Sequence, residues 1–111
     1  MVSYNVVTSS KALSQLEEYI DYIRYTLFNK QAAASVWSDA LETVGKPENV
    51  AGSLSYCDDP DLKELGYRKI SFIHHRYVMI YRVENNTAYV EAIYHQLQDY
   101  ENIFSDSLTE Q

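Results

Sequence analysis

The chain has 111 residues, of which 46% are hydrophobic and 23% are charged, and its formal net charge is −7. These values predict one globular domain over residues 1–111 and exclude an intrinsically disordered chain. The acidic balance also argues against a general nucleic-acid-binding protein, because phosphate binding needs local positive charge.

Cysteine usage and hydropathy indicate where the protein works. Cys57 is the single cysteine, so an internal disulfide is excluded, and we expect its thiol to be inert. No apolar run approaches the roughly 18–20 residues needed to cross a bilayer, and the N-terminal residues lack the pattern of a signal peptide. We therefore expect a cytoplasmic protein with no membrane partner.

The first half of the chain has the pattern of one strand followed by two helices. Residues 4–8 (YNVVT) predict a short strand, and Thr8, Ser9 or Ser10 would cap the helix that follows. One apolar stripe predicts the first helix: Leu13, Leu16, Ile20, Ile23 and Leu27. A second helix, ending at Gly45 and Pro47, would bury another set: Ala33, Val36, Trp37, Ala40, Leu41 and Val44. The two helices should form a hairpin.

The second half has the pattern of a loop followed by three strands. Residues 47–64 predict a loop, with the sequence CDDP as its clearest turn signal. Strands are expected over residues 67–73, 76–84 and 87–95, and Asn85 and Asn86 would form the tight turn between the last two. The tail after residue 97 is compatible with a short C-terminal helix.

The element order β-α-α-β-β-β predicts an α+β fold, with the helix pair on one face of a mostly antiparallel sheet and the other face open. Side chains alternate across a strand. Unpaired arginine is costly to bury, so the side of the middle strand that carries Tyr77 and Tyr81 should face the helices, and the side with Arg76 and Arg82 should stay open. In the last strand alternation places Tyr89, Glu91, Ile93 and His95 on one side, without deciding which side is covered.

Residues 62–104 resemble the C-terminal half of the RelE/ParE family of bacterial toxins. The matching pieces are GYRKI, IYRVE, a short asparagine-containing turn, and a strand that ends in histidine before QDYE. The N-terminal layout, Y.V..T..A opening into L..I.DYI...L.N..AA, is similar as well. The resemblance implies a small toxin of a type II toxin–antitoxin pair, neutralised by an antitoxin protein that wraps it. RelE-like members cut mRNA on the ribosome, and ParE-like members poison DNA gyrase.

Metal-independent RNA cleavage needs a base, an acid and cations that stabilise the phosphorane. His95 is the candidate acid or base, Arg82 and Lys69 are candidates for holding phosphate, and Tyr100 could stack on a base or donate a proton. Further candidate substrate-binding residues are Arg68, Arg76 and His75. No cofactor is expected, and no metal is expected either, because the adjacent pair His74 and His75 lacks a third ligand at a convincing spacing.

Each candidate also has a purely structural interpretation. Arg82 could pair with Glu91 or Glu84 across the hairpin, and Tyr100 could anchor the tail. Nuclease members usually carry basic residues at three positions that are here Val78, Ser71 and Leu97.

Three hypotheses for the function therefore stay open. His95 slightly favours a toxin that cuts mRNA on the ribosome. The missing cations favour a non-catalytic gyrase inhibitor or an inactive module that binds only an antitoxin. Because the chain is acidic, electrostatic steering predicts basic residues in that antitoxin.

Overall fold

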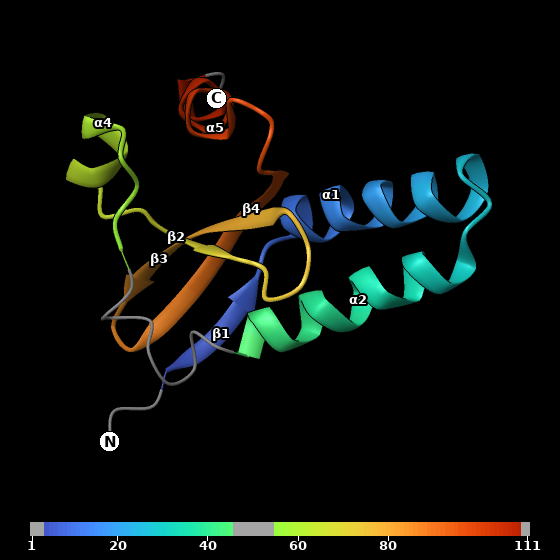
Figure 1. The fold of residues 1–111 in the computed structure, drawn as a ribbon. Helices are drawn as coiled ribbons and strands as arrows, with labels where there is room; N and C mark the ends of the chain where they lie inside the picture. The colour runs from blue at the N-terminus through green and yellow to red at the C-terminus, as the bar shows by residue number, and fades with distance from the viewer. Residues whose placement is uncertain (1–3, 46–54, 110–111) are drawn as a thin grey trace.

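The structure, a computed structural model, describes residues 4–45 and 55–109 and has the expected α+β fold (Figure 1). The elements in chain order are β1 (Asn5–Thr8), α1 (Ser10–Asp21), the π-helical turn η1 (Tyr22–Thr26), α2 (Lys30–Gly45), α4 (Pro60–Glu64), β2 (Arg68–Ser71), β3 (Tyr77–Glu84), β4 (Thr87–His95) and α5 (Tyr100–Thr109). The strand order in the sheet is β1-β4-β3-β2, in which β1 runs parallel to β4 and the other pairs are antiparallel. The expected helical hairpin, the mostly antiparallel sheet and the C-terminal helix are thus confirmed.

Ser9 fixes the start of the hairpin to the sheet. Its hydroxyl oxygen accepts a hydrogen bond from the backbone N–H of Ala12 at 3.0 Å, and the hydroxyl donates to the carbonyl of Glu91 at 2.9 Å. The first contact is the N-cap that the sequence predicts at one of three positions. Leu16 and Ile20 of the predicted stripe are buried, whereas Leu13 and Leu27 are exposed. No helix in the described ranges has the length and hydropathy that a membrane crossing requires.

Helix α2 is rotated relative to the expected face. Ala33, Val36 and Ala40 are buried as predicted, but Trp37 and Leu41 are 43% and 57% exposed. The predicted burial of these two large residues is wrong because α2 turns Asp39 and Thr43 inward instead, and both are buried. The helix ends at Gly45 as expected; the side chain of Val44, and Pro47, lie outside the described residues.

The expectation of a loop over residues 47–64 is wrong at its end, where Pro60–Glu64 forms α4. Asp59 caps this helix, because its carboxylate accepts hydrogen bonds from the backbone N–H groups of Asp61 and Leu62 at 3.0 and 3.1 Å. A proline at the first helical position is also typical of a helix start. Residues 46–54 of the expected loop lie outside the described residues.

The sheet is covered on both faces, so the expectation of an open face is wrong. The helical hairpin packs on the face that carries Tyr77, Met79 and Tyr81, as the sequence predicts. On the other face α4 and α5 contribute Leu62 and Phe104 to a second core cluster. The remaining members of that cluster are Cys57, Tyr67, Val78, Ile80, Ala92 and Tyr94. The physical reason is that this face is apolar in its middle, and burying each large apolar side chain stabilises the fold by about 1.5–3 kcal/mol.

A β-bulge in β4 changes which side chains share a face. Ile80 pairs with Ala92 whereas the next residue, Tyr81, pairs with Val90, so Glu91 is the inserted residue. A one-residue insertion reverses the alternation beyond it. Tyr89 therefore pairs with Arg82 on the second face, while His95 pairs with Tyr77 on the hairpin face. The predicted grouping of Tyr89 with His95 on one side is wrong for this reason.

The turn between β3 and β4 is confirmed. Asn85 and Asn86 have φ values of 49° and 63°, which is the left-handed conformation that this two-residue turn requires and that asparagine tolerates.

Candidate functional site

Lys69 on β2 lies in a cluster of acidic groups beneath α5. Its Nζ is 2.8 Å from the Asp58 carboxylate, 3.0 Å from the Glu101 carboxylate and 3.4 Å from the Tyr100 hydroxyl. Burial works against the ammonium charge, but these three hydrogen-bonding partners outweigh it and raise the pKa of Lys69. Two carboxylates thus compensate the charge that the sequence assigned to phosphate binding.

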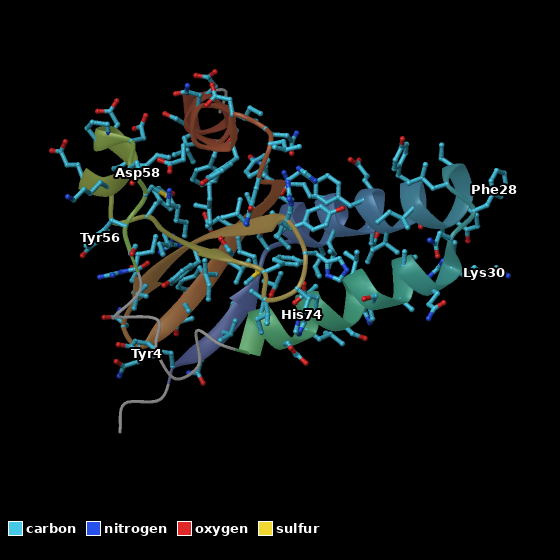
Figure 2. All side chains as sticks on the ribbon, in the orientation of Figure 1. Tyr4, Phe28, Lys30, Tyr56, Asp58 and His74 are labelled. Carbon is cyan, nitrogen blue, oxygen red and sulfur yellow. The ribbon has the colours of Figure 1, made fainter. Side chains whose placement is uncertain are left out.

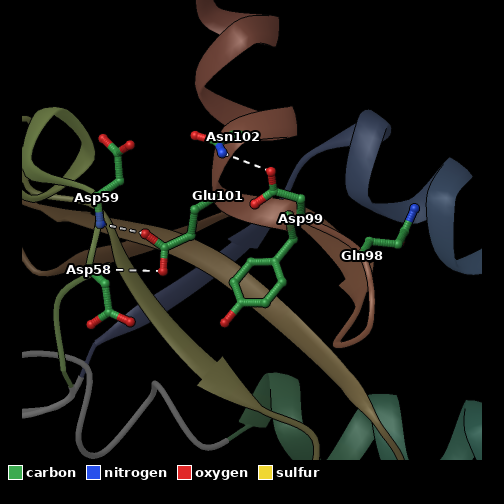
Figure 3. Close-up of a pocket in the computed structure, with 7 residues that line it drawn as sticks. Asp58, Asp59, Gln98, Asp99, Glu101 and Asn102 are labelled. Carbon is green, nitrogen blue, oxygen red and sulfur yellow. Dashed lines mark hydrogen bonds between the residues drawn. The ribbon is translucent and has the colours of Figure 1, made fainter.

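Glu101 connects three elements at this point. Its two carboxylate oxygens accept hydrogen bonds from the backbone N–H groups of Asp58 and Asp59, at 3.1 and 2.7 Å, where α4 begins (Figure 3). The adjoining cavity, of about 390 Å³, is lined by Asp58, Asp59, Gln98, Asp99, Tyr100, Glu101 and Asn102. This lining is strongly acidic and would repel a phosphate.

Arg82 lies on the same face of the sheet as Lys69 but contacts a different set of side chains. Its guanidinium donates a hydrogen bond to Glu84, which raises the pKa of Arg82, and it lies 4.0 Å from Glu91. It also stacks over the ring of Tyr89 at 4.4 Å. The predicted structural alternative, pairing with Glu84 and Glu91, is confirmed. Arg68 likewise stacks over Tyr56, at 3.9 Å, and donates to its hydroxyl at 2.9 Å.

The loop between β2 and β3 is anchored by a buried carboxylate that sequence reasoning did not single out. Asp39, with a side chain only 1% exposed, accepts hydrogen bonds from the backbone N–H groups of Ile73 and His74 at 3.1 and 2.9 Å. It also lies 2.7 Å from Nδ1 of His75. Burial opposes ionisation of Asp39, but the hydrogen bonds from His75 and His74 outweigh it and lower the pKa of the carboxyl. The signal for Asp39 that the sequence offers is a single acidic residue among the small residues on one face of α2.

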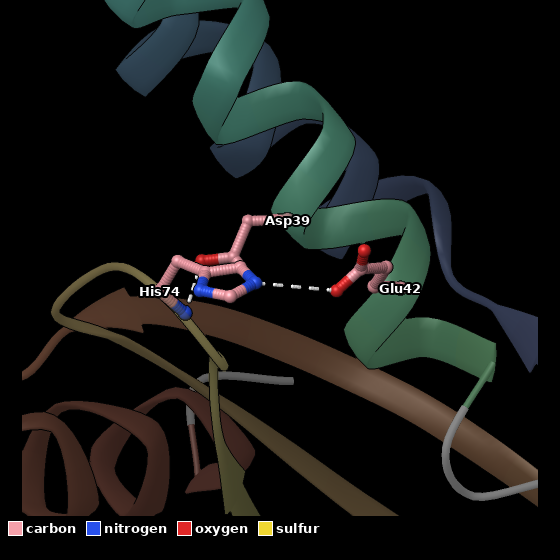
Figure 4. Close-up of side chains that lie close together, drawn as sticks. All are labelled: Asp39, Glu42 and His74. Atoms are coloured by element: carbon pink, nitrogen blue, oxygen red, sulfur yellow. Dashed lines mark hydrogen bonds and ion pairs between the residues drawn. The ribbon is translucent and has the colours of Figure 1, made fainter.

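The structure brings two acidic groups beside His74, which the sequence spacing did not reveal. His74 Nε2 lies 3.5 Å from Glu42, and the ligand atoms of Asp39, Glu42 and His74 lie within 4.8 Å of one another (Figure 4). Asp39, however, already accepts three hydrogen bonds from the loop. A cation would therefore compete with the contacts that hold the loop in place.

His95 sits at the end of β4 with one ring nitrogen already used. Its Nδ1 accepts a hydrogen bond from the backbone N–H of Leu97 at 3.1 Å. In the neutral ring this contact assigns the proton to Nε2, so the ring offers a donor rather than an acceptor. The ring packs edge-on against Tyr77, with centroids 5.3 Å apart. His95 is thus poorly arranged to remove a proton from a substrate as a general base.

All three histidines of the chain line one cavity, of about 470 Å³, where the hairpin extends past the sheet. Its apolar walls come from the hairpin and β3, and its polar rim comes from the β2–β3 loop and the end of β4. The lining residues are Ile23, Leu27, Asn29, Ala32, Val36, His74, His75, Arg76, Tyr77 and His95.

The candidate residues from the sequence therefore fall into four places. Lys69 and Tyr100 meet under α5, and His75 and Arg76 share the cavity with His95. Arg82 stacks on Tyr89, and Arg68 stacks on Tyr56. On β3 the partner of His95 is Tyr77, which lies five positions before Arg82 and faces the opposite side of the sheet. At about 3.3 Å per residue this is a separation of roughly 16 Å along the strand. The catalytic roles assigned to these residues stay predictions.

Comparisons with known proteins agree on the type of fold. The family model described as the ParE toxin of the type II toxin–antitoxin system parDE matches residues 6–100. A chain in the solved structure of the chromosomal ParDE toxin–antitoxin system from P. aeruginosa is 18% identical, with 86% of this chain and 98% of that chain covered and a TM-score of 0.70.

Two further comparisons do not contribute to the family assignment. The isolated E. coli RelE toxin is 14% identical over 96% of this chain and 97% of its own, with a TM-score of only 0.47. No curated protein matches the chain. Because the family model spans most of the sequence, the chain belongs to the ParE toxin family of type II toxin–antitoxin systems.

Proposed function

We propose that this protein is the growth-inhibiting toxin of a toxin–antitoxin pair and that it acts by binding a target protein rather than by cutting RNA. The target that the family implies is DNA gyrase, and the antitoxin is a protein that covers the toxin surface. Both interactions would take place in the cytoplasm.

The dispersal of the candidate catalytic groups is the observation that supports this proposal. RNA cleavage needs an acid, a base and cations that converge on one phosphate. Lys69 is compensated by two carboxylates, and Arg82 lies on the opposite face of the sheet from His95. A chain with a net charge of −7 also offers little attraction for a polyanion. A toxin that acts by binding needs none of these groups to meet.

Exposed apolar side chains on the hairpin suit the proposed protein partners. Trp37 and Leu41 are one turn apart on the outer side of α2, and both are exposed. At the far end of the hairpin Phe28 is 87% exposed (Figure 2). Large exposed apolar groups that neighbour one another, as Trp37 and Leu41 do, are typical of interaction surfaces. We assign the outer side of α2 to the antitoxin.

Controlled expression in a bacterial host tests the mechanism. The wild type and His95→Ala should slow growth equally and should raise a DNA-damage reporter while protein synthesis continues. His74→Ala is the matched control, because His74 is an exposed histidine of the same cavity. Purified protein should also inhibit supercoiling by gyrase.

Two other outcomes would replace the proposal. Cleavage of mRNA and arrest of translation by the wild type but not by His95→Ala would establish the ribosome-dependent nuclease. Normal growth with either variant, despite soluble folded protein, would leave only an antitoxin-binding module.

A further inference from the structure

The cavity that holds the three histidines has an unusual combination of walls. Ile23, Leu27 and Val36 make its hairpin side apolar, and Tyr77 closes it toward the sheet. None of its lining residues in the described part of the chain is acidic, although the whole chain has a net charge of −7. The lining therefore offers one guanidinium, that of Arg76, beside apolar walls, while the acidic groups Asp39 and Glu42 contact His75 and His74 from outside the lining.

Arg76 and His95 provide two hydrogen-bond donors at this cavity. Arg76 directly precedes Tyr77, which pairs with His95 across the sheet, and the backbone carbonyl of Arg76 accepts a hydrogen bond from Gln96 at 2.8 Å. Because Nδ1 of His95 is used by Leu97, its Nε2–H is the donor that stays available. A guanidinium and an imidazole N–H thus flank one apolar cavity.

The loop that carries Arg76 is held before any ligand arrives. Asp39 fixes the backbone of Ile73 and His74 and the ring of His75, whose Nε2 also lies 3.4 Å from the Ser35 hydroxyl. A donor on a fixed loop loses less conformational freedom on binding than a donor on a mobile one. The backbone from which Arg76 extends is therefore in place before an acceptor group binds.

We propose that this cavity binds a side-chain carboxylate of the antitoxin, presented between apolar side chains that fill the rest of the cavity. This inference rests on the proposed antitoxin partnership and names the chemistry that the partner must bring. A carboxylate matches Arg76 in charge and geometry, and its apolar neighbours match Ile23, Leu27 and Val36. A nucleic-acid phosphate fits less well, because a backbone-binding site needs several cations and Arg76 is the one guanidinium or ammonium group among the described lining residues.

The proposal also refines the expected charge of the antitoxin. The acidic surface of the toxin favours basic residues in the antitoxin during encounter. At the one position that enters the cavity, the proposal instead predicts an aspartate or a glutamate. The two expectations concern different residues of the partner.

A pair of small probes tests the chemistry without the antitoxin. Phenylpropionate carries a carboxylate on an apolar body, and phenylpropionamide has nearly the same shape without the charge. Both would be titrated into full-length protein with labelled isoleucine, leucine and valine methyl groups and followed by NMR. The carboxylate should shift the signals of Ile23, Leu27 and Val36, and the amide should bind about tenfold more weakly.

Two variants locate the effect. Arg76→Gln should bind both probes with equal, weak affinity, whereas Lys63→Gln, which removes an exposed cation on α4, should behave as the wild type. Equal binding of the two probes to the wild type would overturn the proposal, as would carboxylate shifts confined to other residues. Displacement of phenylpropionate by a short oligoribonucleotide at lower concentration would overturn it in favour of a nucleic-acid site.

The antitoxin itself provides the second test, with the product of a small reading frame beside this gene as the ligand. One substitution of Asp→Asn or Glu→Gln in it should weaken binding about tenfold to the wild type and have no effect on Arg76→Gln, as a double-mutant cycle requires for a direct pair. Additive losses across every acidic residue would overturn the proposed pair. Toxicity is a separate readout, so loss of this pair would leave the proposed toxin function standing.

Discussion

Asp39 is the residue whose removal should cost the most stability for its size. Its carboxylate joins α2 to the β2–β3 loop through the backbone N–H groups of Ile73 and His74 and the ring of His75. Asp39→Ala would leave these partly buried donors without an acceptor, so we expect the free energy of unfolding to fall by about 2–3 kcal/mol. Urea denaturation measures this change. Glu42→Ala, on the exposed side of the same helix, should change it by less than about 0.5 kcal/mol.

The lowered pKa of Asp39 predicts how the free energy of unfolding changes with pH. The pKa of Asp39 is lower in the folded protein than in the unfolded chain, so its stabilising contribution is present above the unfolded value of about 3.9 and is lost as the pH falls below it. The stability difference between the wild type and Asp39→Asn should therefore shrink in acid. A difference that grows on acidification would contradict the assigned interaction.

Cys57 should be chemically silent in the folded protein. Burial, with a smaller contribution from Glu101, raises the pKa of its thiol to about 12, and the thiolate is the reactive form. Iodoacetamide should label it rapidly only after unfolding in urea. Fast labelling of the native protein would show that α4 and α5 open readily over the second face.

At the scale of elements, α5 is held by both apolar and ionic contacts. Phe104 packs edge-on against Tyr67, with centroids 4.9 Å apart, and Glu101 pairs with Lys69 beneath the helix. Glu101→Gln would break a pair whose side chains are only 13% and 22% exposed, which should cost about 2 kcal/mol.

Amide hydrogen exchange measures this loss element by element. Exchange should speed up in α5 before it does in β3 or β4 if the cluster mainly docks this helix. Glu64→Gln on α4 is the control, because Glu64 is exposed. Equal acceleration in all strands would mean that the cluster supports the whole fold rather than α5.

Local patterns predict the elements of this chain better than their packing. The stripe of Leu16 and Ile20 identified α1, and Asn85 with Asn86 identified the β3–β4 turn. The bulge at Glu91 could not be predicted, because alternation gives no sign of an inserted residue. This bulge alone determines that His95 faces the hairpin. The burial of α5 and the compensation of Lys69 depend on contacts between distant segments, which no local pattern encodes.

The candidate site was predictable in its residue types but not in its grouping. His75, Arg76 and His95 do share a cavity, since the first two lie just before β3 and His95 ends β4, which pairs with the start of β3. Arg82 could not be separated from them by sequence, because its partner Tyr89 changed side through the bulge.

At the scale of the whole molecule, the hairpin extends away from the sheet and ends in exposed apolar groups. Figure 2 shows Phe28 and Lys30 at its far end, while Tyr56 and Asp58 lie at the opposite end of the molecule. The sheet faces are closed by α1 and α2 on one side and by α4 and α5 on the other (Figure 1). A partner that displaces no helix would therefore bind the outer surface of a helix, an edge strand of the sheet or a cavity such as the one lined by the histidines.

Trp37 distinguishes these routes, because it is the single tryptophan and lies exposed on the outer side of α2. If the antitoxin covers α2, its binding should shift the emission of Trp37 to shorter wavelength. Trp37→Gln should then change the free energy of unfolding by less than about 0.5 kcal/mol yet weaken antitoxin binding by more than about 1 kcal/mol. Leu65→Gln, an exposed apolar residue after α4, should alter neither quantity. Unchanged emission together with wild-type affinity of Trp37→Gln would exclude α2 and direct attention to the cavity beside His95.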